Sequence, residues 1–107
     1  MRTPAQRRNL LILRDEILPG IEEGELRMRA FFYRCGTPSC LAGHAFASGA
    51  FPGIRIHTGL FSARVVKGLH VVFGLSFDEW YHIFGVNLPN DPTWLAANIT
   101  DLLCAEE

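Results

Sequence analysis

The sequence predicts a mainly α protein: a compact bundle of about five short helices with at most one small two-stranded β element. Thr3, Thr37 and Asp91 each stand directly before a proline, which is the pattern of an N-cap followed by the first helical residue. Apolar residues recur three and four positions apart through much of the chain. The 107 residues are 49% hydrophobic. We therefore expect one domain over residues 1–107 with a single core.

The first helix is expected over residues 4–18. Thr3 is its N-cap and Gln6 completes a capping box, in which each side chain bonds the other residue's backbone N–H. Pro19-Gly20 ends the helix. On a regular helix most of its apolar side chains share one broad face: Leu10, Leu11, Leu13, Ile17 and Leu18. Ile12 falls off that face, so we expect it to be exposed.

Two stretches carry the alternation that is typical of β-strands. Between residues 26 and 33, Leu26, Met28, Ala30 and Phe32 occupy every second position. This pattern predicts a short strand, but leucine, arginine and methionine also favour helix, so both structures stay open for residues 26–33. Ile54 and Ile56 predict a very short strand after the Pro52-Gly53 turn. That strand could pair with residues 26–33.

Two further helices are expected in the middle of the chain. The first covers residues 38–48, with Thr37 as its N-cap and Gly49 just past its end. Its interior is made of small residues that let a neighbouring backbone or ring approach closely: Ala42, Gly43, Ala45 and Ala47. The second covers residues 62–73 and ends at Gly74. Its apolar stripe consists of Val65, Val66, Leu69, Val72 and Phe73.

The last two helices have the strongest start signals. Ser76 and Glu79 form a capping box for a short helix that Gly85 ends. Asp91 caps a helix over residues 92–104. The buried side of this last helix is expected to consist of Leu95, Ile99, Leu102 and Leu103.

Charge is distributed unevenly along the chain. Residues 1–34 carry seven arginines and five acids. Residues 35–77 carry three bases without an acid, and residues 78–107 carry six acids without a base. The simplest interpretation is that the acidic end packs beside the basic middle and neutralises it. The alternative is a dimer in which an acidic surface of one copy faces a basic surface of its neighbour.

Residues 35–45 form the most distinctive motif, Cys-Gly-Thr-Pro-Ser-Cys-Leu-Ala-Gly-His-Ala. The motif resembles the Cys-Gly-Thr-x-x-Cys-x-Ala-Gly-x-Ala element of small bacterial and phage-borne proteins of unknown function. In that group a short helix of the kind Gly74-Leu75-Ser76-x-x-Glu79 follows. The resemblance implies a helical fold and carries over no catalytic residue.

Cys35, Cys40 and His44 are the candidate site residues, because zinc is held by cysteine and histidine at short spacings. Cys40 and His44 are four apart and share a helix face. The fourth ligand would be one of His57, His70, His82 or Cys104. A second hypothesis makes Cys40 a reactive thiol, with its pKa lowered by the helix dipole and His44 as its base.

The simplest interpretation of the same motif is structural. Cys40 is then a small core residue and His44 lies at the rim. On this interpretation we expect no catalytic residue, no cofactor and no metal, and the chain is not an enzyme. Whether Cys35 and Cys40 are free, bridged or metal-bound stays open.

Several functional classes are disfavoured by the composition. The longest apolar run has four residues, far below the ~18 of a membrane span. The apolar run near the N-terminus is also too short to be the core of a signal peptide. The sequence therefore predicts a cytoplasmic protein. Nucleic acid is disfavoured because a helix-turn-helix in residues 62–85 would present Asp78 and Glu79 to phosphates. We therefore expect a non-catalytic module that binds a protein partner or forms a homodimer.

Overall fold

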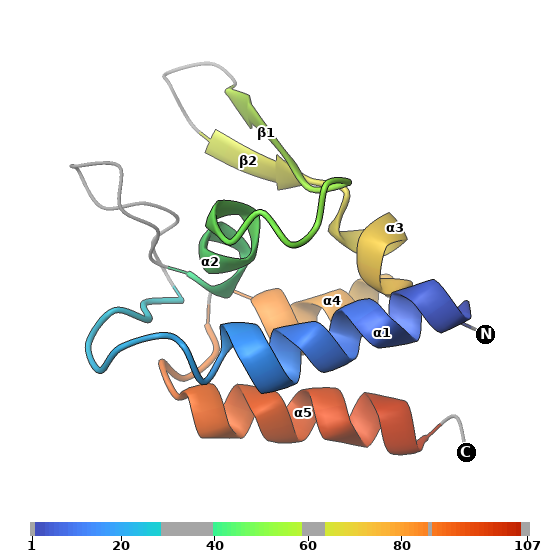
Figure 1. The fold of residues 1–107 in the computed structure, drawn as a ribbon. Coiled ribbons are helices and arrows are strands. Elements are labelled where there is room, and N and C mark those ends of the chain that lie inside the picture. Colours follow the sequence, from blue (N-terminus) through green and yellow to red (C-terminus); the bar gives the residue numbers. More distant parts are fainter. Residues whose placement is uncertain (1, 29–39, 59–63, 86, 106–107) are drawn as a thin grey trace.

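Five helices and one antiparallel two-stranded sheet make up residues 2–28, 40–58, 64–85 and 87–105, the part of the chain that this computed structural model describes (Figure 1). The predicted mainly α class with one small β element is confirmed. The elements in chain order are α1 Pro4–Ile12, the π-helical turn η1 Leu13–Ile17, α2 Leu41–Ala47, β1 Arg55–Thr58, β2 Arg64–Lys67, α3 Leu69–Phe73, α4 Phe77–Phe84 and α5 Pro92–Cys104.

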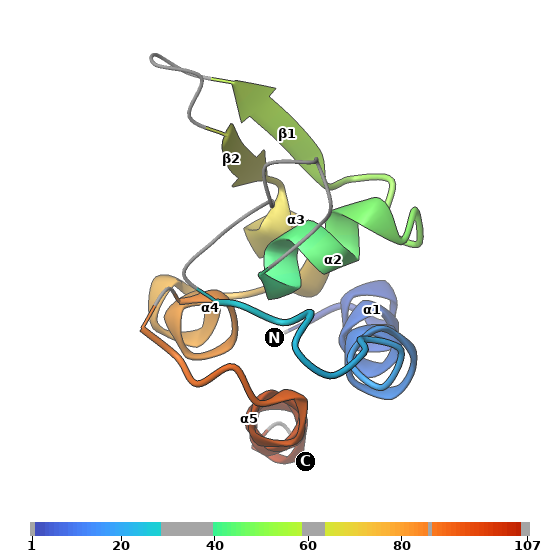
Figure 2. The same cartoon turned by 90° about the vertical axis from the view of Figure 1, so that its left-hand side faces the viewer.

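The helices α1, α4 and α5 lie at the corners of a triangle when viewed along their axes (Figure 2). α2 and α3 cover one side of this triangle, and the β1–β2 hairpin lies beyond them, farthest from α5. Phe73 of α3 is fully buried and packs edge-to-face on Phe51, with ring centroids 5.0 Å apart, and against Phe84 of α4 at 5.7 Å. The core fills the inside of the triangle, where Leu10, Leu95 and Ile99 are fully buried, and it continues to α2 and α3 above. No helix among the described residues is long and apolar enough to cross a membrane.

The first helix begins as the sequence predicts. Gln6 N–H donates to Thr3 Oγ1 at 3.1 Å and Thr3 N–H donates to Gln6 Oε1 at 2.8 Å, which completes the capping box. Past Ile12 the helix widens into η1, where Leu18 N–H donates to the Leu13 carbonyl at 3.0 Å. Because this bond spans five residues, Leu13 and Leu18 both reach the core.

The expectation of an exposed Ile12 is wrong, because Ile12 is half-buried and packs against the core. α1 contacts both α3 and α5, so the core covers more of its surface than a single stripe. Asn9 Nδ2 donates to the Val72 carbonyl at 2.9 Å on the α3 side, and Arg7 Nη1 donates to the Leu103 carbonyl at 3.4 Å on the α5 side. Leu11 is the more exposed apolar side chain of this helix.

The predicted helix over residues 62–73 is wrong in its first part, because residues 64–67 form β2. β2 pairs antiparallel with β1, and Ile56 lies opposite Val66. The short strand predicted around Ile54 and Ile56 therefore exists as β1, and its partner among the described residues is β2. Adjacent β-branched valines favour a strand, and Gly68 at φ +97° ends that strand before α3 begins.

Residues 26–28 contain neither strand nor helix. Leu26 and Met28 are buried and Arg27 is exposed, so burial alternates as it would in a strand, although these three residues form no β-sheet hydrogen bonds. Met28 N–H instead donates to the side-chain oxygen of Asn90 at 2.7 Å. The rest of the predicted segment, residues 29–33, lies outside the described residues.

α2 starts later than predicted. Its N-cap is Cys40, which has extended backbone angles and whose Sγ accepts a hydrogen bond from Gly43 N–H at 3.4 Å. The helix therefore begins at Leu41 rather than at Pro38, and the proposed cap at Thr37 lies outside the described residues. Its end agrees with the prediction, since Ser48 is the C-cap and Gly49 follows with φ +73°.

α4 and α5 agree closely with the prediction. Ser76 N–H donates to Glu79 Oε1 at 2.9 Å and Glu79 N–H donates to Ser76 Oγ at 3.3 Å, and α4 ends at Gly85. Asp91 Oδ1 accepts from Thr93 N–H at 3.0 Å at the start of α5. The buried residues of α5 are Leu95, Ile99 and Leu103, with Leu102 half-buried beside them.

The expected packing of the acidic end beside the basic middle occurs at α4, which contacts α2 and α3, but no ion pair joins the two regions within the described residues. The hairpin and α5 lie on opposite sides of the helical body (Figure 1). The partner of Glu79 is Arg2 at the N-terminus, with Nη2 and Oε2 2.7 Å apart and the arginine side chain only 6% exposed. The charges of the hairpin and of α5 are thus kept apart.

The joint between β2 and α3 generates a stability prediction. A Cβ added to Gly68 would clash with the Gly53 carbonyl, whereas one added to Gly49 meets no atom within 4 Å, although both glycines have positive φ. Gly49→Ala should therefore cost about 1 kcal/mol from backbone strain alone, and Gly68→Ala more than about 2 kcal/mol. Urea unfolding of both variants measures this. Equal losses would contradict the role given to Gly68.

The Arg2–Glu79 ion pair generates a pH prediction. Burial raises the pKa of Glu79. The Ser76 hydrogen bonds and the Arg2 guanidinium together lower this pKa by more than burial raises it, so it lies below its ordinary value of 4.5. Ionised Glu79 therefore stabilises the fold above pH 4.5, and this contribution disappears as the pH falls through the lower folded-state pKa.

Glu79→Gln keeps an acceptor for the cap and removes the charge. The variant should be about 1–2 kcal/mol less stable than the wild type at pH 7, and this gap should close as the pH falls below 4.5. Urea unfolding from pH 7 to pH 3 measures the gap. A gap that stays constant over this range would show that the ion pair does not act as described.

Candidate functional site

Cys40 and His44 lie at the start and in the middle of α2, as the sequence predicts, but they make separate contacts. The thiol of Cys40 is buried at 8% exposure and caps its own helix. The imidazole Nε2 of His44 lies 2.9 Å from the Glu25 carbonyl oxygen. A carbonyl oxygen only accepts hydrogen bonds, so Nε2 carries a proton and donates it. Only Nδ1 of His44 is left for a metal or for a thiol proton.

The environment of Cys40 opposes ionisation. Burial raises the pKa of the Cys40 thiol above its ordinary value, and the backbone N–H of Gly43 only partly counteracts this. The thiol is therefore protonated at neutral pH, which favours the structural interpretation of this residue. Cys35 lies outside the described residues. Among the residues that are described, no three His, Cys, Asp or Glu side chains are grouped so as to hold a metal.

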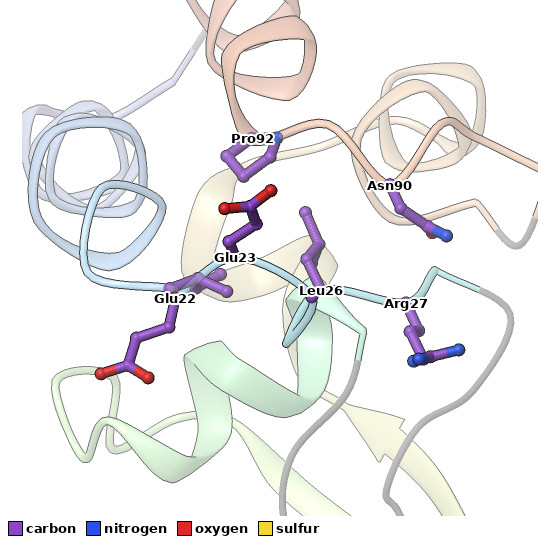
Figure 3. A pocket seen from close by; sticks show the side chains of 8 residues that line it. Glu22, Glu23, Leu26, Arg27, Asn90 and Pro92 are labelled. Carbon is purple, nitrogen blue, oxygen red and sulfur yellow. The ribbon is translucent and has the colours of Figure 1, made fainter.

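One cavity, of about 310 Å³, lies between the loop after η1 and the loop before α5. Figure 3 shows Glu23 reaching toward Pro92, whereas the side chains of Glu22 and Arg27 point away from it. The amide oxygen of Asn90 is already bound to the backbone of Met28. The polar groups of this cavity therefore do not converge on one point, as a small-ligand site requires.

A second cavity of about 290 Å³ lies between η1 and α2, lined in part by Glu16 and His44. The Nε2 group of His44 is engaged with Glu25, so this cavity offers one carboxylate and little else for recognition. Of these cavities, it is the one that a residue of the predicted Cys-His motif, His44, lines.

A third cavity, of about 250 Å³, lies between α4 and α5 and is acidic. We call it the acidic cleft; it is lined by Asp78, Glu79, His82, Asn98, Asp101 and Leu102. Asn98 Nδ2 donates to the His82 carbonyl at 2.9 Å, which ties α5 to α4 across the cleft. His82 Nδ1 donates to the Asp78 carbonyl one turn earlier in α4. The cleft thus gathers three carboxylates on two helices that are held together.

Next to the cleft, α4 carries a stack of rings. This aromatic row consists of Phe77, Trp80 and His70, with centroids 5.9 Å apart for Phe77–Trp80 and 6.1 Å for Trp80–His70. His70 Nδ1 donates to the Leu75 carbonyl at 2.9 Å, which fixes its ring. Phe77 is 70% exposed, and Val71, which follows His70 in α3, is 75% exposed. The row and the cleft share α4: the row extends from α4 to α3, and the cleft extends from α4 to α5.

Sequence analysis did not identify this surface. Phe77 and Trp80 are three residues apart at the start of a capped helix, which is a signal that their rings could stack. The third ring, His70, joins them only because α3 packs on α4. Its contribution is a tertiary contact without a local sequence signal.

Comparisons with protein-family models, with curated proteins and with solved structures found no match for this chain.

The two described cysteines should differ in reactivity. Cys104 is exposed at the end of α5, whereas Cys40 is buried with a raised pKa. Iodoacetamide at pH 8 should therefore modify Cys104 about tenfold or more faster than Cys40, with peptide mass mapping as the readout. In urea the two rates should become similar. A native Cys40 that reacts as fast as Cys104 would support thiol chemistry instead.

Proposed function

We propose that this chain is a small non-catalytic protein-binding module whose binding surface is the aromatic row together with the acidic cleft. The observation that carries the proposal is the aromatic row, in which the exposed ring of Phe77 stacks on Trp80 and Trp80 stacks on His70. A single exposed apolar side chain is common on protein surfaces. Three stacked rings are less so, and aromatic side chains contribute much of the energy at protein interfaces.

The row is also rigid before any partner arrives. Trp80 packs against the core, and the ring of His70 is fixed by its bond to Leu75. A partner that covers Phe77 therefore orders few side chains, and less of the binding energy is lost as conformational entropy. The carboxylates of the cleft supply orientation and partner choice.

The alternative is a metal- or thiol-dependent site around Cys35, Cys40 and His44. The buried, protonated thiol of Cys40 and the engaged Nε2 of His44 weigh against this alternative. Elemental analysis of the purified chain would support it if zinc or iron were present near one equivalent.

Site-specific photo-cross-linking tests the proposed surface. Benzoylphenylalanine replaces Phe77 in one variant, and in the control it replaces Phe46 of α2, an exposed phenylalanine that belongs neither to the aromatic row nor to the acidic cleft. Irradiation of cells that express each variant should give a discrete higher-mass adduct from position 77 and none from position 46. Mass spectrometry then identifies the protein attached. Equal labelling from both positions, or none from either, would contradict the proposed function.

A further inference from the structure

The β1–β2 hairpin presents two exposed cations for which no ion pair occurs within the described residues. Arg55 of β1 lies directly opposite Lys67 of β2 in the ladder, and both side chains are exposed. Like charges on directly opposed residues destabilise a β-ribbon. Neither residue forms an ion pair within the described residues. This end of the hairpin is therefore a cationic pair whose repulsion a carboxylate partner would relieve.

The acidic cleft has the complementary charge. Of its three carboxylates, Glu79 is already bound to Arg2. Asp78 and Asp101 are exposed, and no ion pair to either occurs in the described part of the chain. Two carboxylates and two cations thus have no ion-pair partner among the described residues. The hairpin lies across the helical body from α5, which carries Asp101 (Figure 1).

We infer that the partner of the α4 surface is a second copy of this chain, whose β1–β2 hairpin places Arg55 and Lys67 at the acidic cleft. The inference rests on the proposed function, because it assigns an occupant to the same surface. In a two-fold pair the contact forms twice, since each copy gives its hairpin and receives the other.

A charge swap tests this contact. R55E/K67E makes the hairpin acidic, and D78K/D101K makes the cleft basic. Each variant alone should be monomeric in sedimentation velocity at low salt, because its hairpin and cleft then carry the same sign. Their equimolar mixture should form a dimer with one copy of each, because acidic hairpin meets basic cleft and basic hairpin meets acidic cleft. The wild-type dimer should weaken at least tenfold as salt rises to about 0.5 M.

The matched control is Arg8→Glu, which reverses one exposed cation on α1, compared with Arg55→Glu on the hairpin. Only Arg55→Glu should weaken the dimer, and circular dichroism should show all variants folded. A monomeric wild type at low salt, variants that dimerise as well as the wild type, or a mixture that stays monomeric would each overturn the inference.

The outcomes also separate this inference from the proposed function. A monomeric wild type whose position 77 still cross-links to a different protein would remove the second copy as partner and keep the binding surface. Binding of a duplex oligonucleotide is measured by fluorescence anisotropy for the wild type and for R55E/K67E. A monomeric wild type that binds the duplex, together with loss of this binding in R55E/K67E, would assign the hairpin to nucleic acid and overturn the inference.

Discussion

The close approach of two glycine backbones fixes the hairpin on the helical body. Gly68 follows β2 with φ +97°, and a Cβ there would meet the carbonyl of Gly53, just before β1. A Cβ on Gly53 would in turn lie 2.8 Å from Val72 of α3. The chain therefore leaves the sheet and enters α3 through a single residue. Phe51 and Phe73 pack beside this joint, so the base of the hairpin is tied to the core.

This placement has an electrostatic consequence. The hairpin lies beyond α2 and α3, across the body from α5 (Figure 2), and no ion pair joins its cations to the acids of α5 within the described residues. Although the net charge is only −1, residues 35–77 are basic and residues 78–107 are acidic. Such an arrangement favours association between copies over neutralisation within one copy, and it makes that association sensitive to salt. The aromatic row supplies the apolar area that charge alone does not.

The helix termini could be predicted because their signals are local. The Thr3–Gln6 and Ser76–Glu79 capping boxes and the Asp91 cap each lie within four residues, and each occurs as expected. The start of α2 was misplaced because a thiol at Cys40, rather than the usual hydroxyl, caps the helix. For residues 64–67 the valines fit a helical stripe and a strand equally well, and only the pairing with β1 decides between them.

The candidate site was only partly predictable, because its side chains depend on contacts between segments that are distant in the sequence. The spacing correctly placed Cys40 and His44 in one helical segment, but the partner of His44 is a carbonyl nineteen residues earlier. Ile12 was judged from a single helix, whereas its burial depends on two neighbouring helices. The aromatic row and the acidic cleft both join side chains from two helices, so they exist only once those helices pack.

The central claim is that the fold separates two complementary charged surfaces, which then meet between copies. Amide chemical shifts recorded over a concentration series at low salt test it most directly. The account predicts concentration-dependent shifts at Arg55 and Lys67 together with Asp78, His82 and Asp101, and their reversal by salt. Shifts confined to one of these two sets, or spectra that do not change with concentration, would contradict it.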